Sequence, residues 1–250
     1  MSGHSKWATT KHKKAAVDKT RGKLFAKIIR QVEVAAREGG GDIEANATLR
    51  TMYHKARSSS IPLDTIEKAI KRGTGELEGV RYETINYEGY APCGVAMIVE
   101  VLSDNRNRTG AEVRSTFSKA GGSIAEPGAV SWQFERKGVV ILPKSAGSED
   151  DLMTLGLDHG LEDLEDQGDS WQMTVTPTDF NDLRQALDDA KIAYDSADLT
   201  MVASQTVPLD NESDARKVLK LLDALEDNDD VQNVYANFDI PDAVLDLVSA

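Results

Sequence analysis

Residues 23–37 read KLFAKIIRQVEVAAR, and this stretch indicates how the first third of the chain folds. At about 100° per residue, the rotation of an α-helix, its apolar side chains fall within one broad stripe. Its cations fall on the opposite side, within a sector of roughly 80°. These four cations, called the basic ridge below, are Lys23, Lys27, Arg30 and Arg37. The pattern predicts a helix with one face toward a core and a basic ridge behind it.

Two further helices are predicted after this one. Glycines at residues 39–41 end the first helix, because glycine readily takes the left-handed conformation at a helix C-terminus. Asp42 is the expected N-cap of the second helix, Pro62 opens the third, and Gly73 ends it. Three amphipathic helices with short connections predict a basic α-helical domain over residues 1–75.

After Gly79 the pattern changes to short strands alternating with helices. We expect strands at residues 94–102, 170–173, 197–203 and 231–238, and a hairpin formed by residues 129–134 and 138–142. We expect helices at residues 109–120, 180–190 and 215–225. The tetrapeptide SWQF at residues 131–134 is echoed by SWQM at residues 170–173, which suggests two related units.

This order of elements predicts an α+β multidomain chain. An N-terminal three-helix domain is followed by two ferredoxin-like α+β domains, the second inserted in the first. The first of these two comprises residues 76–144 plus 206–250. The inserted acidic α+β domain comprises residues 145–205.

The charge of the chain is strongly polarised along the sequence. Residues 1–75 hold 16 Lys and Arg against 7 Asp and Glu, a net charge of +9. Residues 145–250 hold 5 against 26, a net charge of −21, and the whole chain has a net charge of −13. Polarity on this scale steers how a molecule meets a charged partner.

The sequence lacks the common motifs of catalysis, of phosphate-binding loops and of metal binding. The four histidines have no spacing typical of metal ligands, and residues 227–230 (DNDD) lack the glycine and the closing glutamate of a calcium loop. We therefore expect no catalytic residue, no metal and no cofactor, and no small-molecule substrate is evident. An enzyme that uses an interdomain cleft near Cys93 is the alternative, although a lone cysteine is usually just a small apolar residue.

Composition also bears on location. No apolar run approaches the roughly 20 residues that cross a bilayer, and no apolar stretch of a secretion signal follows the basic N-terminus. A single cysteine suits a reducing compartment. We expect a cytoplasmic protein without a membrane partner, and the sequence carries no signal of its oligomeric state.

The N-terminal residues have the composition of a nucleic-acid-binding segment. Seven Lys or Arg stand within the first 23 residues, against the single acid Asp18. Trp7 can stack on an unpaired base, and the small residues around it allow two backbones to approach closely. The alternative is a solvated basic segment whose Trp7 packs into the helical domain.

A second candidate site lies at residues 103–109 (SDNRNRT), between a predicted strand and a predicted helix. Arg106 and Arg108 would stand beside the N–H groups of the helix N-terminus, where a phosphate or carboxylate binds readily. The alternative is a capped loop in which these arginines pair with Glu112 or another neighbouring acid.

Six short motifs resemble the YebC/PmpR family. They are GHSKW at residues 3–7, KHKKAA at 11–16, RGK at 21–23, KIIR at 27–30, YEGY at 87–90 and SDNRNRT at 103–109. They run in the family's order across the first 140 residues, whereas the acidic C-terminal third matches only in pattern. The resemblance implies a helical N-terminal domain, two ferredoxin-like domains and no known catalytic activity.

The resemblance also implies one of two roles. Members of the family are described as DNA-binding transcriptional regulators. Others act on the ribosome and ease the synthesis of proline-rich stretches, among them the mitochondrial translational activator of cytochrome oxidase subunit one. This chain departs from the family where it has Ala91, Pro92, Cys93 and Gly94 in place of the usual Gly-Pro-Gly-Gly. It also has Ala47 and Thr48 in place of Pro-Arg.

Physical chemistry modestly favours RNA over duplex DNA as the partner. The body beyond residue 75 has a net charge of −22 and repels phosphates, although screening over about 8–10 Å lets a basic domain dock end-on. Structured RNA with splayed bases suits a basic segment that carries a tryptophan. We predict a nucleic acid as the partner, either ribosomal RNA on the ribosome or DNA. The candidate binding residues are His4, Ser5, Lys6, Trp7, Lys11, His12, Lys13, Lys14, Arg21, Lys23, Lys27, Arg30, Arg106 and Arg108.

Overall fold

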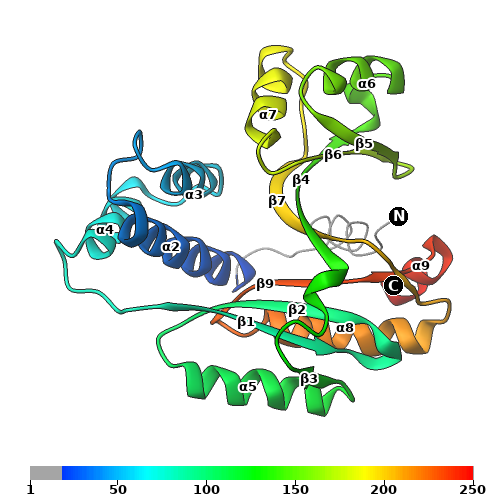
Figure 1. The fold of residues 1–250 in the computed structure, drawn as a ribbon, viewed down its shortest axis with the longest axis horizontal. Coiled ribbons are helices and arrows are strands. Elements are labelled where there is room, and N and C mark those ends of the chain that lie inside the picture. Colours follow the sequence, from blue (N-terminus) through cyan, green and yellow to red (C-terminus); the bar gives the residue numbers. More distant parts are fainter. Residues whose placement is uncertain (1–18, 250) are drawn as a thin grey trace.

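The computed structural model describes residues 19–249, which form an α+β protein with three parts (Figure 1). A three-helix region comes first, followed by two four-stranded sheets that each carry helices. Figure 1 shows the helical region beside the two sheets, with the second sheet and its helices above the first. Within residues 19–249, no helix is both long and apolar enough to cross a membrane.

The helical region consists of α2 (Lys19–Gly39), α3 (Ala47–Ser58) and α4 (Leu63–Thr74). The predicted apolar stripe of α2 is buried at Ile28 and Val32, which pack against Leu49 of α3 and Ile66 of α4. The three predicted helices are therefore confirmed. Their core closes because each helix offers one apolar face to the other two.

Two of the predicted helix ends are wrong. Asn46, not Asp42, caps α3, and its side chain accepts a hydrogen bond from the backbone N–H of Leu49 at 3.0 Å. Asn46 is buried and also donates to two backbone carbonyls at the end of α2, so the cap joins two helices. Asp42 lies in the preceding turn and accepts from Glu44 N–H at 2.9 Å.

The C-terminus of α4 differs in a similar way. The helix runs past Gly73 and is capped by Gly75, whose φ of 85° is left-handed. Gly73 instead allows α4 to approach α2 closely, because a Cβ atom there would lie 2.4 Å from the carbonyl oxygen of Glu33. The two glycines have separate roles, one in packing and one in ending the helix.

The first sheet has the strand order β3-β1-β2-β9, and all neighbouring strands are antiparallel. Its strands are β1 (Glu83–Tyr90), β2 (Ala96–Ser103), β3 (Ser123–Ala125) and β9 (Val231–Ala236). One face is covered by α5 (Arg106–Lys119), α8 (Glu212–Glu226) and α9 (Asp242–Ser249), with Met97 and Phe117 in the shared core. A short parallel pair, β8 (Val207–Pro208) and β10 (Phe238–Asp239), adjoins the sheet.

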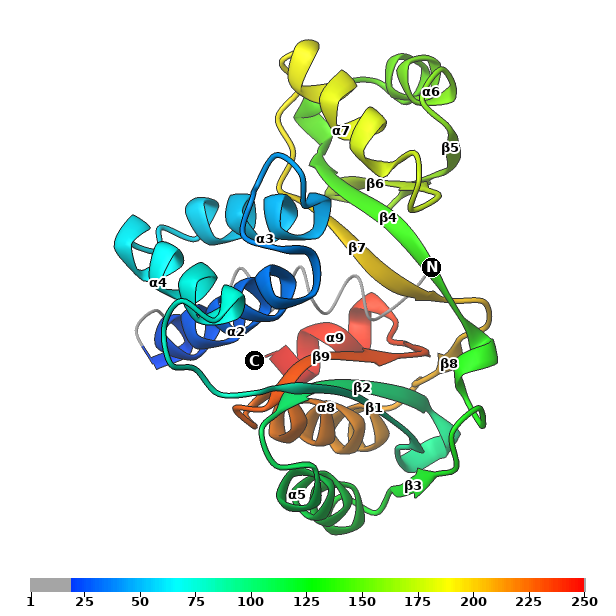
Figure 2. The ribbon, with the colours of Figure 1, turned by 60° about the vertical axis from the view of Figure 1, so that its left-hand side comes forward.

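The second sheet has the order β5-β6-β4-β7 and is also antiparallel throughout. Its elements follow the chain as β4 (Phe134–Pro143), α6 (Glu149–Leu157), β5 (Leu161–Asp166), β6 (Ser170–Val175), α7 (Phe180–Asp189) and β7 (Ser196–Ala203). This is a β-α-β-β-α-β succession, and it lies between β3 and α8 of the first sheet. Figure 2 shows β4 and β7 rising from the first sheet to carry the second.

The structure also corrects the strand predictions. The expected hairpin of residues 129–134 and 138–142 is wrong, because Phe134–Pro143 is one strand that pairs with both β6 and β7. This strand belongs to the second sheet, whereas the expected boundary after residue 144 places it with the first. The first sheet has the chain succession β-β-α-β followed by α-β, so the order expected for both sheets is found in the second alone.

The repeated tetrapeptide is not a structural repeat. Residues 131–133 form a 3₁₀ turn in which Trp132 is 70% exposed, whereas Trp171 lies in β6 and is buried. Trp171 packs in the core under α6 and α7, and Trp132 lies in the connection between the two sheets. The same three letters therefore have unrelated roles.

Candidate nucleic-acid interface

The basic ridge of α2 lies against the turn between α8 and β9, residues 226–230, called the acidic turn below. Lys27 Nζ donates to the carbonyl oxygen of Glu226 at 2.8 Å, and Lys23 Nζ donates to Asp227 O and Oδ1, both at 2.9 Å. Arg30 donates to Asp229 O and to Asp230 Oδ1, the latter at 3.0 Å. Figures 1 and 2 show the start of α2 beside the place where α8 ends and β9 begins.

These contacts have a clear physical basis. The last carbonyls of a helix lack partners within the helix and carry partial negative charge, so cations stabilise that end. The Lys23–Asp227 ion pair is largely exposed and contributes little by itself. Lys23, Lys27 and Arg30 together attach the helical region to the first sheet. The ridge was expected to be an open face for phosphates, but in this structure three of its cations are engaged by the acidic turn.

Asp230 is the centre of this contact. Its side chain is buried, and Oδ2 accepts from Ser103 Oγ at 3.0 Å, Thr109 Oγ1 at 2.6 Å and Arg108 at 2.7 Å. Its other oxygen, Oδ1, accepts from Arg30. One carboxylate therefore joins α2, the end of β2, the start of α5 and the start of β9.

The surroundings of Asp230 favour its charged form. Burial alone would raise the pKa of this carboxyl. The hydrogen bonds from Thr109, Arg108 and Ser103 and the positive charge of Arg108 outweigh burial, so the pKa lies below its ordinary value. A buried carboxylate with this many donors fixes the contact between the helical region and the first sheet.

The two arginines at the start of α5 have different environments. Arg108 donates to Asp104 at 2.9 Å as well as to Asp230, which is the capped-loop arrangement considered above with different acids. Asn105 caps the helix by accepting from the backbone N–H of Arg108. Arg106 is exposed. Arg30 and Arg108, which are far apart in the sequence, thus meet on the two oxygens of Asp230.

Most of the other candidate binding residues precede the part of the chain that the structure describes. His4, Ser5, Lys6, Trp7, Lys11, His12, Lys13 and Lys14 precede residue 19 and lie outside the described residues. Arg21 belongs to the first turn of α2. The structure therefore locates Lys23, Lys27, Arg30, Arg106 and Arg108 near the acidic turn and α5, and their role in nucleic-acid binding stays a prediction.

An aromatic pair that is not among the candidate binding residues lies at the far end of the first sheet. Tyr90 Oη and Trp132 Nε1 both donate to the carbonyl oxygen of Ala129, at 3.3 and 3.0 Å. Glu88 fixes this loop by accepting three backbone N–H bonds, from Gly128, Val130 and Ser131. The signal in the sequence is the YEGY motif itself, whose glutamate and second tyrosine both bind the loop.

The turn that departs from the family pattern has a left-handed residue. Cys93 has a φ of 65°, and Gly94 follows at 77°. Glycine takes this conformation without strain, which gives a physical reason for the glycine that the family usually has at the position of Cys93. The Cys93 side chain is exposed and lies beside Asp214 at the start of α8.

Comparisons with known proteins agree with the architecture. A sequence model described as "TACO1/YebC protein N-terminal domain" matches residues 5–76, and one described as "TACO1/YebC second and third domain" matches residues 82–238. Relatives called "Probable transcriptional regulatory protein" in Saccharopolyspora erythraea and Thermobifida fusca are 56% and 55% identical, and each alignment covers 100% of both chains.

A solved structure is similar as well. The crystal structure of the conserved hypothetical protein Aq1575 from Aquifex aeolicus superposes with a TM-score of 0.82. The two sequences are 44% identical, and the match covers 92% of this chain and 94% of that chain. The arrangement of helical region and two sheets is therefore shared by a protein of known structure.

Proposed function

The chain belongs to the TACO1/YebC family, and from this premise we propose that it is a cytoplasmic regulator of gene expression that binds nucleic acid through its basic N-terminal domain. The observation that carries the proposal is the division of charge. Residues 1–75 have a net charge of +9 and the remainder has −22. A polyanion approaching this molecule is attracted to one end and repelled by the rest.

The contacts of the basic ridge bear on which residues we propose for binding. Lys23, Lys27 and Arg30 already hold the acidic turn, so a phosphate would have to displace carbonyl and carboxylate oxygens to reach them. The segment before α2 carries four further lysines, namely Lys6, Lys11, Lys13 and Lys14. We assign the phosphate contacts to these lysines, with Trp7 as a stacking residue, and we treat the ridge as the anchor of the domain.

Two partners fit this surface. The relatives' name, probable transcriptional regulatory protein, favours DNA. The acidic body favours docking of one end onto structured RNA, as in a ribosome-associated factor that eases the synthesis of proline-rich stretches. Sequence-specific reading of duplex DNA needs a helix whose polar side chains are free to reach base edges. Helix α4 is a weak candidate for that role, since Lys68 pairs with Asp64 and Arg72 with Glu33. We therefore propose the ribosome first and DNA second.

The partner can be identified by sedimentation of cell extracts through a density gradient. A ribosome-bound protein is expected to move with large particles, and sequencing of nuclease-protected fragments should return one region of ribosomal RNA. A protein that stays at the top of the gradient contradicts the ribosomal role. A promoter footprint that survives an excess of competitor DNA would favour the regulation of transcription instead.

The proposed division into domains is consistent with this role. We propose that residues 76–133 with 206–250 form one α+β domain and that residues 134–205 form an inserted ferredoxin-like domain, which moves the expected start of the insert from residue 145 to Phe134 because β4 pairs within the second sheet. In this arrangement the acidic domains keep nucleic acid at the N-terminal end.

We also propose that the protein is not an enzyme, and Cys93 provides the test. Although Cys93 is exposed overall, partial desolvation of its thiol raises the pKa, and the neighbouring Asp214 carboxylate raises it further. A raised pKa leaves less thiolate at neutral pH, the opposite of an activated nucleophile. Alkylation by iodoacetamide at about pH 7.5 is therefore expected to be several-fold slower than for free cysteine.

A matched variant separates this effect from simple shielding. Asp214→Asn removes the charge and leaves the shape, so alkylation of Cys93 should become faster. Alkylation of the natural protein that is faster than that of free cysteine would contradict the proposal and return attention to an enzyme built around this turn.

A further inference from the structure

The aromatic pair at the far end of the first sheet, Tyr90 and Trp132, is exposed although both side chains are held in place. Trp132 is the most exposed large hydrophobic side chain among residues 19–249, and Tyr90 is exposed as well. Their polar atoms, Trp132 Nε1 and Tyr90 Oη, donate to one carbonyl oxygen, that of Ala129. The two side chains therefore converge on one point. Because both donors are already satisfied, the pair offers a partner mainly ring surface.

The loop beneath the aromatic pair is fixed by a carboxylate. Glu88 accepts from the backbone N–H groups of Gly128, Val130 and Ser131 at 2.8, 2.8 and 2.9 Å. Partial burial alone would raise the pKa of this carboxyl, but these hydrogen bonds outweigh burial, so the pKa lies below its ordinary value. Glu88 therefore stays charged at neutral pH. A surface that is fixed before it binds loses little conformational entropy on binding.

The surroundings of the aromatic pair are acidic. Residues 86–94 and 121–133, which contain both rings and the loop, hold two glutamates, Glu88 and Glu126, and no Lys, Arg or His. Glu126 is exposed, and its backbone carbonyl accepts from the N–H of Ala129 at 3.1 Å, so it begins the turn that holds both rings. The whole chain adds a net charge of −13. A phosphate chain is therefore repelled from this surface, whereas a cation is attracted to it.

The next cations along the chain have other neighbours. Arg136 lies near Tyr235, and Lys137 pairs with Glu135 at 3.1 Å and with Glu162 at 2.9 Å. The acidic surroundings of the aromatic pair are thus not neutralised by the start of β4.

Cation–π contacts occur elsewhere in the protein, but the aromatic pair makes none within residues 19–249. The Arg30 guanidinium lies 5.5 Å from the ring centroid of Tyr82, and Lys144 Nζ lies 3.1 Å from that of Trp171. An aromatic face attracts a cation, and the planar, weakly hydrated guanidinium of arginine also stacks on it. An exposed ring beside an acidic residue therefore suits an arginine that another molecule supplies.

We propose that the aromatic pair is a docking surface for an arginine side chain on a basic segment of a partner protein. The guanidinium would stack on Trp132 and donate to the Glu126 carboxylate, and Tyr90 would contact the methylene groups of the arginine stem. Nucleic acid suits this surface less well, because a base can stack on a ring but its phosphates would meet acidic residues without a cation. The surface is distinct from the basic N-terminal domain and adds a protein partner to the proposed nucleic-acid partner.

Isothermal titration calorimetry of the full chain with defined peptides tests the proposal. The probes are an acetylated glycine–arginine peptide, the same peptide with lysine in place of arginine, and the same peptide with citrulline, which is planar but uncharged. The arginine peptide should bind at least about threefold more tightly than the lysine peptide and about tenfold more tightly than the citrulline peptide. Absence of binding by the arginine peptide, or equal affinity for the arginine and citrulline peptides, overturns the proposal.

Trp132→Ala makes the test specific to the ring, since it leaves the net charge unchanged. It should weaken binding of the arginine peptide at least about tenfold. The unfolding temperature should stay nearly the same, because the ring is exposed. Glu126→Gln removes one charge and keeps the shape, so it should weaken binding about threefold. Natural affinity in Trp132→Ala would contradict the proposal, and natural affinity in Glu126→Gln would contradict the role of Glu126.

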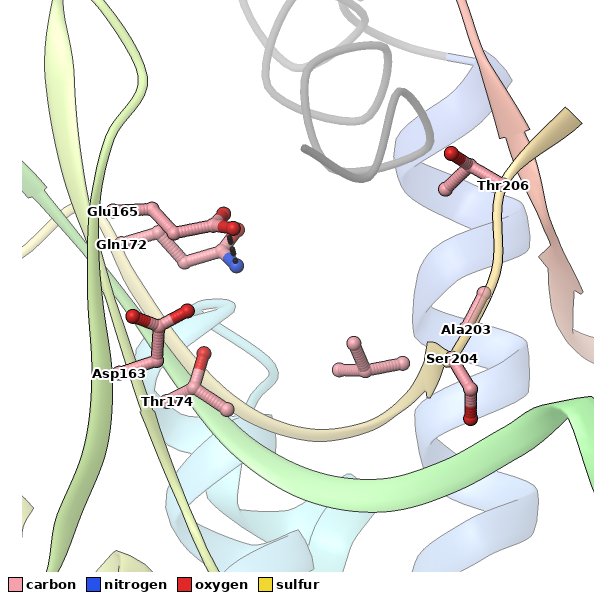
Figure 3. A pocket seen from close by; sticks show the side chains of 8 residues that line it. Asp163, Glu165, Gln172, Thr174, Ala203, Ser204 and Thr206 are labelled. Carbon is pink, nitrogen blue, oxygen red and sulfur yellow. Dashed lines mark hydrogen bonds between the residues drawn. The ribbon is translucent and has the colours of Figure 1, made fainter. Parts of the chain in front are cut away.

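An acidic surface elsewhere in the protein provides the control for attraction by net charge. Asp163 and Glu165 of β5 line a polar pocket opposite Ser204 and Thr206 (Figure 3), and none of the described residues that line it is aromatic. Asp163→Asn with Glu165→Gln removes two charges there and should change affinity for the arginine peptide less than about twofold. Weakening equal to that of Trp132→Ala would show attraction by net charge alone and would count against the proposal.

RNA binding distinguishes this surface from the proposed nucleic-acid interface. Trp132→Ala should bind a labelled single-stranded RNA as tightly as the natural protein does. The variant with glutamine at Lys6, Lys11, Lys13 and Lys14 should bind the arginine peptide at least as tightly as the natural protein. Loss of RNA affinity in Trp132→Ala, with peptide affinity unchanged, would assign the ring to a nucleobase and overturn the proposal. The docking surface and the proposed function therefore fail independently.

Discussion

Asp230→Asn is expected to lower the free energy of unfolding by about 3 kcal/mol, the largest effect of a single substitution in this account. The carboxylate is buried and accepts from Ser103, Thr109, Arg108 and Arg30. An amide of the same size places an NH₂ group against some of these donors, leaves Arg30 without its carboxylate partner and leaves Arg108 with Asp104 alone. Denaturant unfolding of the purified protein measures the loss.

Asp229→Asn is the matched control. Asp229 is the preceding residue, its side chain is exposed, and only its backbone carbonyl contacts Arg30. This substitution removes the same formal charge from the acidic turn and should cost less than about 0.5 kcal/mol. Equal losses in the two variants would show that net charge, not the buried carboxylate, stabilises the contact.

The pH dependence of the same two proteins has a definite sign. The folded-state pKa of Asp230 lies below its ordinary value of about 4, so its stabilising contribution is complete above that value. The contribution is lost as pH falls through the lower folded-state pKa. The natural protein should therefore lose more stability than Asp230→Asn between about pH 4 and pH 2.

Neutralising Lys6, Lys11, Lys13 and Lys14 together, by substitution with glutamine, is expected to weaken RNA binding several hundredfold at about 0.1 M salt. Each phosphate contact releases counterions from the RNA. For single strands each contact adds about 0.7 to the slope of log affinity against log salt, so four contacts add about 3. Fluorescence anisotropy with a labelled single-stranded RNA, repeated at several salt concentrations, measures both quantities.

A control for this variant removes four cations elsewhere. Arg114, Lys119, Lys191 and Lys220 are exposed and lie outside the helical region, so their replacement by glutamine changes the net charge equally. This control should keep nearly the natural slope. A slope that flattens equally in both variants would mean that overall charge, not the N-terminal segment, governs binding.

The sequence predicts local structure better than the contacts between distant segments. The stripe of residues 23–37 predicts both faces of α2 correctly, because the period of a helix is a local property. The partner of the basic ridge, the acidic turn at residues 226–230, lies about 200 residues away along the chain. Periodicity carries no information about such a contact. From the sequence alone, the basic ridge is therefore interpreted as a surface that is free to bind phosphates.

Cap and strand predictions failed for related reasons. Asp42 is a residue type that often caps helices. Asn46 caps α3 instead, and its side-chain amide also donates to backbone carbonyls at the end of α2. The pattern predicts two strands at residues 129–134 and 138–142, yet β4 runs without a break from Phe134 to Pro143, since it pairs with β7 through the residues between them.

The central claim is that the segment before α2 contacts phosphates while the basic ridge anchors the domain. The most direct test compares the salt dependence of RNA binding in the N-terminal variant with that of Lys23→Gln combined with Lys27→Gln. Our account predicts that the ridge variant keeps the natural slope, whereas the N-terminal variant loses about 3 from it. A ridge variant with a clearly flattened slope, beside an N-terminal variant that keeps the natural one, would contradict the account.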